Sequence, residues 1–123
     1  MENDQTIKSL ATLRMAIGVS AWATPRLAGR AFGLDAAGNP QSPYLARLFG
    51  IRDIALGVGT LSTAGEAQRQ WLTLGVVCDA ADAAAGVLAG RAGYLPKVAT
   101  VLVTATAVAA AGMGLSALAN SEA

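Results

Sequence analysis

A chain of 123 residues is long enough for one domain, and its composition separates it from most soluble proteins. Charged residues make up only 14% of the chain and hydrophobic residues 54%, whereas soluble domains carry about 25% charged residues. The formal net charge is +1, so the basic surface that binds nucleic acid is missing, and we expect no nucleic-acid partner. The composition instead favours a membrane protein whose main partner is the lipid bilayer.

The chain contains one cysteine, Cys78, and no histidine. A single cysteine excludes an intrachain disulfide. The missing histidine excludes a histidine-ligated haem, the usual zinc sites and a nucleophile activated by histidine. A magnesium site built only from aspartates is disfavoured, because arginines in the same segments balance the carboxylates. We therefore expect no metal and no other cofactor.

Four apolar segments dominate the sequence, and we expect each of them to be a membrane-spanning helix. They cover about residues 6–24, 44–64, 70–94 and 97–119. Pro25 ends the first segment and Pro96 separates the last two, and only the fourth meets a strict hydropathy criterion. The short link 65–69 predicts that the second and third helices are antiparallel neighbours. The predicted fold is all-α, a single integral membrane domain, residues 1–123, built as an up-down-up-down four-helix transmembrane bundle.

The stretch between the first two predicted spans is the longest irregular part of the chain. Residues 26–34 fit a short amphipathic helix on the membrane surface, or a plain connector. Residues 35–43, rich in Gly, Asn and Pro, predict a turn.

One face of each predicted span carries small residues at three- and four-residue spacing, and in the first three spans charged residues interrupt this face. In a water-soluble helix that face would carry Leu, Ile and Val, whereas small residues suit close helix packing inside a membrane. The four stripes are Ala11, Arg14, Gly18 and Ala21; Gly50, Asp53, Gly57, Thr60 and Ala64; Gly75, Asp79, Asp82, Gly86 and Gly93; and Thr100, Thr104, Ala107, Ala111 and Gly114.

Aromatic residues mark the two predicted membrane interfaces. An up-down-up-down bundle places Trp22, Tyr44 and Tyr94 at one interface and Trp71 at the other. The connections on the first side hold most of the Arg and Lys residues outside the spans. The positive-inside rule therefore predicts that both chain ends lie outside the cell.

Ionisable residues lie deep within the predicted spans. Arg14, Arg52 and Asp79 each lie roughly 12–15 Å from a helix end, at 1.5 Å per residue, which is near the middle of a hydrocarbon layer about 30 Å thick. Three arginines and three aspartates fall within the spans, so that their formal charges cancel: Arg14, Arg47, Arg52, Asp53, Asp79 and Asp82. A charge at this depth costs at least about 2.5 kcal/mol, so we expect these groups to pair inside the bundle or around a cavity.

Two of these residues, Asp79 and Asp82, are three apart and therefore share one helix face. Repulsion between neighbouring carboxylates favours one protonated acid beside one ionised base. We expect Asp79 and Asp82 to share these catalytic roles, with Arg52 and Asp53 orienting them and Arg14 balancing the charge. The further predicted binding residues are Gly75, Gly57, Trp22 and Tyr44.

Such a site suits a cofactor-free enzyme that isomerises or cyclises an apolar small molecule or opens its epoxide. The alternative is a non-catalytic accessory subunit or small-molecule carrier, in which Arg–Asp pairs only specify helix assembly. A hydrophobic pocket open to lipid beside Asp79 would favour the enzyme, and a dry, fully paired core would favour the alternative. The sequence leaves assembly into a homo-oligomer open.

Several motifs together resemble a family of small four-span bacterial membrane proteins. The most specific are Gly50-x-Arg52-Asp53 and Asp79-x-x-Asp82, and Arg14-x-x-x-Gly18 accompanies them. The resemblance covers most of the chain and implies a four-helix bundle in which Arg52, Asp53, Asp79 and Asp82 are the marked residues, but it implies no established reaction. We expect the bacterial inner membrane as the location. By architecture alone the chain is also similar to small four-span enzymes that isomerise or cyclise lipophilic substrates, except for the haem-dependent kind, which needs a histidine.

Overall fold

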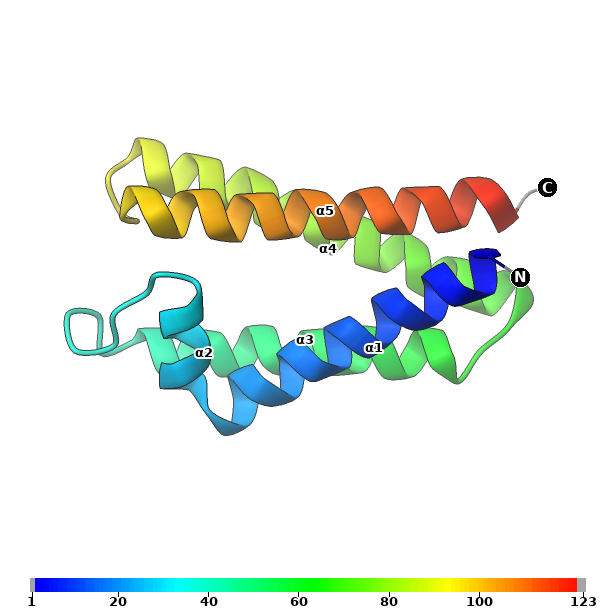
Figure 1. Cartoon of the computed structure of the whole chain (residues 1–123), viewed down its shortest axis with the longest axis horizontal. Coiled ribbons are helices and arrows are strands. Elements are labelled where there is room, and N and C mark those ends of the chain that lie inside the picture. The colour runs from blue at the N-terminus through cyan, green and yellow to red at the C-terminus, as the bar shows by residue number, and fades with distance from the viewer. Residues whose placement is uncertain (1, 122–123) are drawn as a thin grey trace.

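The computed structural model describes residues 2–121, and the regular elements in that range are all α-helices. They are α1 (Glu2–Ala23), α2 (Pro25–Ala31), α3 (Ser42–Leu61), α4 (Gly65–Arg91) and α5 (Lys97–Ser121). The prediction of an all-α fold is confirmed. The four long helices alternate in direction, so the start of α1 and the end of α5 lie at one end of the molecule and α2 lies at the other (Figure 1).

The long helices form two antiparallel pairs. α1 packs most extensively against α3, and α4 packs most extensively against α5, whereas the contacts between the two pairs are sparser. The pairs form two layers in Figure 1, and α2 packs against α1 and α3 at its end of the molecule. Side chains that join α1 or α3 to α4 or α5 therefore help to hold the two pairs together.

α1 and α3 approach closely because glycines face each other where the helices cross. A Cβ atom on Gly18 would lie 2.6 Å from the carbonyl oxygen of Gly50, and a Cβ atom on Gly50 would lie 2.6 Å from that of Gly18. Further along, a Cβ atom on Gly57 would lie 2.8 Å from the carbonyl oxygen of Ala11. Only glycine leaves room for two backbones to meet in this way. The small-residue stripes predicted for these two helices are therefore their packing faces.

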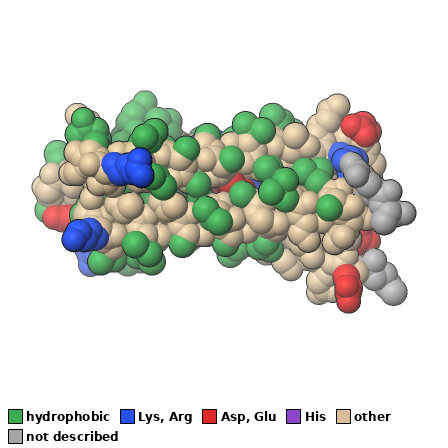
Figure 2. All heavy atoms as spheres, turned by 90° about the horizontal axis from the view of Figure 1, so that it is seen from above, with side chains coloured by type: hydrophobic (Ala, Val, Ile, Leu, Met, Phe, Trp, Pro, Cys, Tyr) green, Lys and Arg blue, Asp and Glu red, His purple; other side chains and the backbone are tan. Residues whose placement is uncertain are grey.

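Small side chains fill most of the interior, and most large apolar side chains face outward. One cluster is an exception, because it buries larger apolar side chains. It joins α1, α4 and α5 near the end with the chain termini and consists of Ile7, Leu10, Leu72 and Ala117. Elsewhere, exposed Leu, Ile and Val side chains occur on all four long helices. Figure 2 shows hydrophobic side chains along the molecule, charged side chains near its two ends, and only a small acidic spot between them. Such a distribution is the reverse of that expected in a water-soluble domain.

The N-terminal half of α4 differs from the prediction. The helix begins at Gly65 rather than near residue 70, so the predicted link 65–69 is wrong and the connection is residues 62–64. Glu66 lies in the first turn, where its negative charge stabilises a helix N-terminus. The prediction that α3 and α4 are antiparallel is confirmed (Figure 1).

The other end of α4 also differs, because the helix stops at Arg91 instead of continuing to residue 94. Gly93 has a φ of 79°, its N–H donates to the carbonyl of Gly90 at 3.2 Å, and the N–H of Tyr94 donates to that of Ala89 at 2.9 Å. These two bonds form a Schellman motif, which ends a helix at a glycine. Gly93 is therefore a turn residue and not part of the small-residue stripe.

Other helix ends also differ from the prediction. α1 begins at Glu2, four residues before the predicted start, with Glu2 and Asp4 in its first turn, where acidic residues are favourable. α3 ends at Leu61, so Ala64 lies outside it. The short helix predicted within residues 26–34 is present as α2, which begins with Pro25, a residue well suited to the first helical position.

Candidate functional site

A buried arginine of α1 reaches across the molecule to α4. Nη1 of Arg14 donates to Oδ1 of Asp79 at 3.0 Å, and Nη2 donates to Oδ2 at 2.5 Å. Both side chains are only 7% exposed. Two parallel bonds between a guanidinium and a carboxylate form the strongest common geometry for such a pair. The Arg14–Asp79 pair therefore ties the α1/α3 layer to the α4/α5 layer.

Gly75 provides the space that the Arg14 side chain occupies. It lies one turn before Asp79 on the same face of α4, and it is buried. A Cβ atom on Gly75 would lie 2.8 Å from Nη2 of Arg14, closer than van der Waals contact allows. The sequence predicted Gly75 as a binding residue, and in the structure it accommodates the guanidinium.

A second carboxylate, Asp53 of α3, lies next to the same guanidinium. Its Oδ1 is 3.6 Å from Nη1 of Arg14, and its side chain is also 7% exposed. This distance exceeds that of a hydrogen bond, and within residues 2–121 the Asp53 carboxyl makes no other ion pair or hydrogen bond. Asp53 is therefore near Arg14 but is not held by it in the way Asp79 is.

A second ion pair, Arg52–Asp82, lies between α3 and α4. Nη2 of Arg52 donates to Oδ2 of Asp82 at 2.5 Å, and the two side chains are 37% and 30% exposed. The guanidinium also lies 5.2 Å from the ring centre of Phe49, within reach of a cation–π interaction. Nε of Arg52 is buried and has no hydrogen-bond partner among the described residues. This pair also joins the two layers, but it is partly exposed at the surface of the bundle.

Asp79 and Asp82 share one face of α4, as their spacing predicted, but each binds a different arginine. Asp53 contacts Arg14 and not its sequence neighbour Arg52. Neighbours in a helix point about 100° apart, so they contact different helices. Charged groups of different helices pair in both cases, as expected, but only the Arg14–Asp79 pair lies in the interior.

Arg47 does not belong to this cluster, contrary to the prediction that it helps to balance the buried charge. It is exposed, its Nε donates to the carbonyl oxygen of Trp22 at 3.0 Å, and its guanidinium lies 6.0 Å from the centre of the Trp22 ring. Arg47 lies near the start of α3, so its long side chain reaches the end of the bundle. The cluster thus contains two arginines and three aspartates, and their formal charges do not cancel.

Three of the predicted binding residues lie away from the ion pairs. Gly57 lies at the crossing of α1 and α3, where a Cβ atom would lie 2.4 Å from Cγ of Met15. Trp22 and Tyr44 are exposed near the end of the molecule that carries α2. The structure therefore gathers Arg14, Gly75, Asp53 and Asp79, while Trp22 and Tyr44 lie at one end of the molecule.

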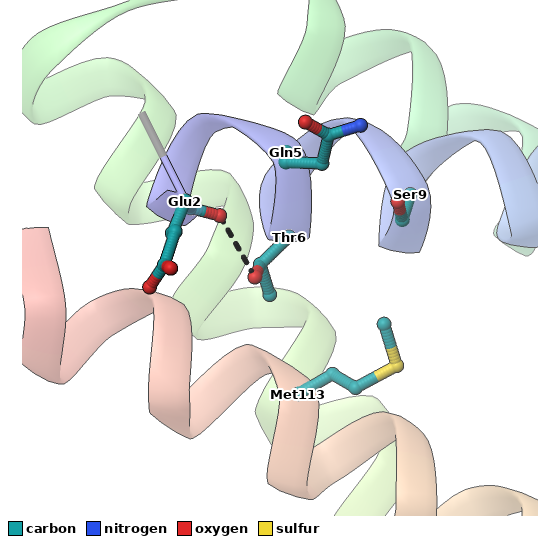
Figure 3. A pocket seen from close by; sticks show the side chains of 5 residues that line it. All are labelled: Glu2, Gln5, Thr6, Ser9 and Met113. Atoms are coloured by element: carbon teal, nitrogen blue, oxygen red, sulfur yellow. Dashed lines mark hydrogen bonds between the residues drawn. The ribbon is translucent and has the colours of Figure 1, made fainter.

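Two surface hollows lie apart from the cluster, and the sequence did not point to either. The first is shallow, lies between the start of α1 and α5, and is shown in Figure 3: its lining residues are Glu2, Gln5, Thr6, Ser9 and Met113. Thr6 donates its hydroxyl hydrogen to the carbonyl of Glu2 at 3.1 Å there. The second is lined by Glu66, Arg69, Gln70, Thr73 and Leu74. Neither hollow includes a residue of the two ion pairs.

Within residues 2–121, no group of three Asp, Glu or Cys side chains is arranged to hold a metal ion.

No known protein family, curated protein or solved structure matches this chain. The resemblance to the four-span bacterial family stays a hypothesis. The function must therefore be argued from the ion pairs and from the surface around them.

Proposed function

We propose that the chain is an integral membrane protein with four spans, in which two Arg–Asp pairs specify the assembly of the helices. α4 and α5 are long and apolar enough to cross a membrane. Only 22% of the most apolar stretch of α4 and 17% of that of α5 is buried, whereas the core helix of a soluble protein would be mostly buried. The remainder of both stretches is an apolar surface that a bilayer would cover.

The other two long helices, α1 and α3, support four spans for a different reason. They contain ionisable residues, but Arg14 and Asp53 point inward and Arg52 is paired. Many of their outward side chains are apolar, including Leu13 and Ile51, and exposed charged residues such as Lys8 and Arg47 lie toward the starts of the helices. A helix whose charges are turned inward and paired is compatible with a lipid surround. We propose the bacterial inner membrane as its location, in line with the resemblance.

The observation that carries the assembly role is the direction of the two ion pairs. Both run between the α1/α3 pair and α4, where helix packing is sparser. Without a hydrophobic driving force in lipid, polar contacts between helices fix which faces meet. This role is that of a non-catalytic accessory subunit or a small-molecule carrier, whose charges hold the bundle in one arrangement.

Membrane insertion is tested by fractionation. The protein should sediment with membranes, resist extraction by salt or carbonate, and require detergent for purification, because its exposed apolar surface is incompatible with water. A monodisperse protein in detergent-free buffer would contradict the four spans.

The assembly role is tested by removing Arg14. In Arg14→Gln, Asp79 stays buried without its partner, and breaking a buried pair costs about 3–5 kcal/mol of unfolding free energy. The triple variant Arg14→Gln with Asp53→Asn and Asp79→Asn should recover most of that loss, because none of the three groups is then charged. The control is Arg47→Gln, at an exposed arginine, which should change the unfolding free energy by at most about 1 kcal/mol. An Arg14→Gln variant as stable as the parent would remove the assembly role.

A second candidate is the cofactor-free acid/base enzyme acting on an apolar small molecule. The observation that favours it is the exposure of the Arg52–Asp82 pair, which leaves a charged group open at the side of the bundle. Purified parent and Asp82→Asn would be incubated with a panel of apolar epoxides and alkenes, and products followed by mass spectrometry. Turnover by the parent that is lost in Asp82→Asn at unchanged melting temperature would support the enzyme. No turnover of any panel member by the parent would count against it.

A further inference from the structure

The fully buried part of the cluster contains more acid than base. One guanidinium, that of Arg14, faces two carboxyl groups, those of Asp53 and Asp79, and all three side chains are 7% exposed. If both carboxyl groups were ionised, this trio would carry a formal charge of −1. An uncompensated charge away from water is strongly unfavourable.

Arg14 binds the two carboxyl groups unequally. It binds Asp79 through two hydrogen bonds, at 3.0 and 2.5 Å, whereas the nearest oxygen of Asp53 is 3.6 Å from Nη1. A charge-assisted bidentate pair requires an ionised carboxylate. Asp79 is therefore the ionised partner of Arg14, and Asp53 is the carboxyl group that has no hydrogen-bonded cation.

The second positive charge that acts on Asp53 is that of Arg52, which Asp82 already neutralises. The charged groups that act on it are Arg14, Arg52, Asp79 and Asp82. Of these, Arg52 points away round the helix and is hydrogen-bonded to Asp82. The aspartates of α4 only add negative charge, and α5 has no charged residue within 98–121.

We propose that Asp53 is a proton-binding site, and that its carboxyl group holds a proton at mildly acidic pH in the folded bundle. The proton makes the buried trio neutral, which is the usual response of a carboxyl group buried without a counter-charge. When Asp53 loses this proton, it becomes a second anionic partner for Arg14 on α3 and competes with Asp79 on α4. Protonation of Asp53 thus controls how firmly Arg14 holds the two helix layers together. This last step rests on the proposed assembly role, whereas the proton itself rests only on burial and charge.

The test is infrared spectroscopy of the detergent-purified protein with isotope-labelled aspartate. At mildly acidic pH the parent should show the C=O stretching band of a protonated aspartic acid. The band should be lost in Asp53→Asn and retained in the control Asp35→Asn, because Asp35 is exposed and lies outside the cluster. The Asp53→Asn variant should also keep the parent's melting temperature, since Asn has the shape of a protonated Asp and carries no charge.

Three results would overturn the proposal: no such band in the folded parent, a band that persists in Asp53→Asn, or an Asp53→Asn variant that fails to fold. These outcomes are distinct from failure of the proposed function. A protein that is soluble without detergent would refute the membrane role, and an Arg14→Gln variant that is fully stable would refute the assembly role. In both cases the infrared band would still report whether Asp53 is protonated.

Discussion

Replacing Gly75 with alanine should separate Arg14 from Asp79 without changing either charged residue. A Cβ atom at position 75 would lie 2.8 Å from Nη2 of Arg14, whereas ordinary contact begins at 3.4 Å. The guanidinium must therefore retreat by about 0.6 Å, the difference between these distances. It cannot do so along its bonds to Asp79, which are already 2.5 and 3.0 Å long and fix the guanidinium in place.

The expected loss of stability follows from two opposing effects of Gly75→Ala. Breaking a buried ion pair costs about 3–5 kcal/mol, and alanine favours the helix over glycine by about 1 kcal/mol. The net loss of unfolding free energy should be about 2–4 kcal/mol. Gly112 is the matched control, because it lies within α5 and has nothing within 4 Å of the position of a Cβ atom. Gly112→Ala should be neutral or should stabilise by up to about 1 kcal/mol.

Thermal unfolding in detergent, followed by circular dichroism, compares Gly75→Ala and Gly112→Ala with the parent under one condition. If the two variants proved equally stable, the Arg14 side chain would have space that the structure denies it. In that case the claim that Gly75 exists to accommodate the guanidinium would be wrong.

Two further predictions concern topology and packing. In a Cys78→Ala background, thiol labels at Asp35→Cys and Ser121→Cys should react from opposite faces of membrane vesicles, with position 35 cytoplasmic; labelling from one face would exclude the up-down-up-down order. Gly50→Leu should lower stability by at least about 1–3 kcal/mol, because its Cβ atom would lie 2.6 Å from the carbonyl oxygen of Gly18; a stable Gly50→Leu protein would show that α1 and α3 do not cross there.

The sequence predicted the packing faces well, because glycine and alanine at three- and four-residue spacing have few alternative explanations in an apolar helix. Gly18 and Gly50 do meet at a crossing, as small-residue stripes imply. Helix ends were predicted less well. Residues 65–69 include Glu, Gln and Arg, which look like a polar link but are also good helix formers. Gly93 fits the stripe by spacing alone, yet its positive φ makes it a helix terminator.

The sequence could identify the charged residues of the site but not their partners. Spacing shows which side chains share a face of one helix, while the pairing depends on how each helix is rotated against the next. Arg52 and Asp53 are adjacent in the chain and contact different helices. Arg47 is counted with the buried charges only because it lies within the predicted span 44–64. Its actual partner, the carbonyl oxygen of Trp22, depends on the crossing of α1 and α3.

The two ion pairs differ in a way that assigns them different roles. Arg14–Asp79 is bidentate and buried, with Gly75 packed against the guanidinium, so a substrate could reach Asp79 only by breaking the contact that joins the layers. Arg52–Asp82 has a single hydrogen bond and is about one-third exposed, so an outside molecule can approach Asp82 while the bundle stays closed. If the protein carries out chemistry on an apolar molecule, the open pair is where it takes place, and the buried pair holds the helices that position it.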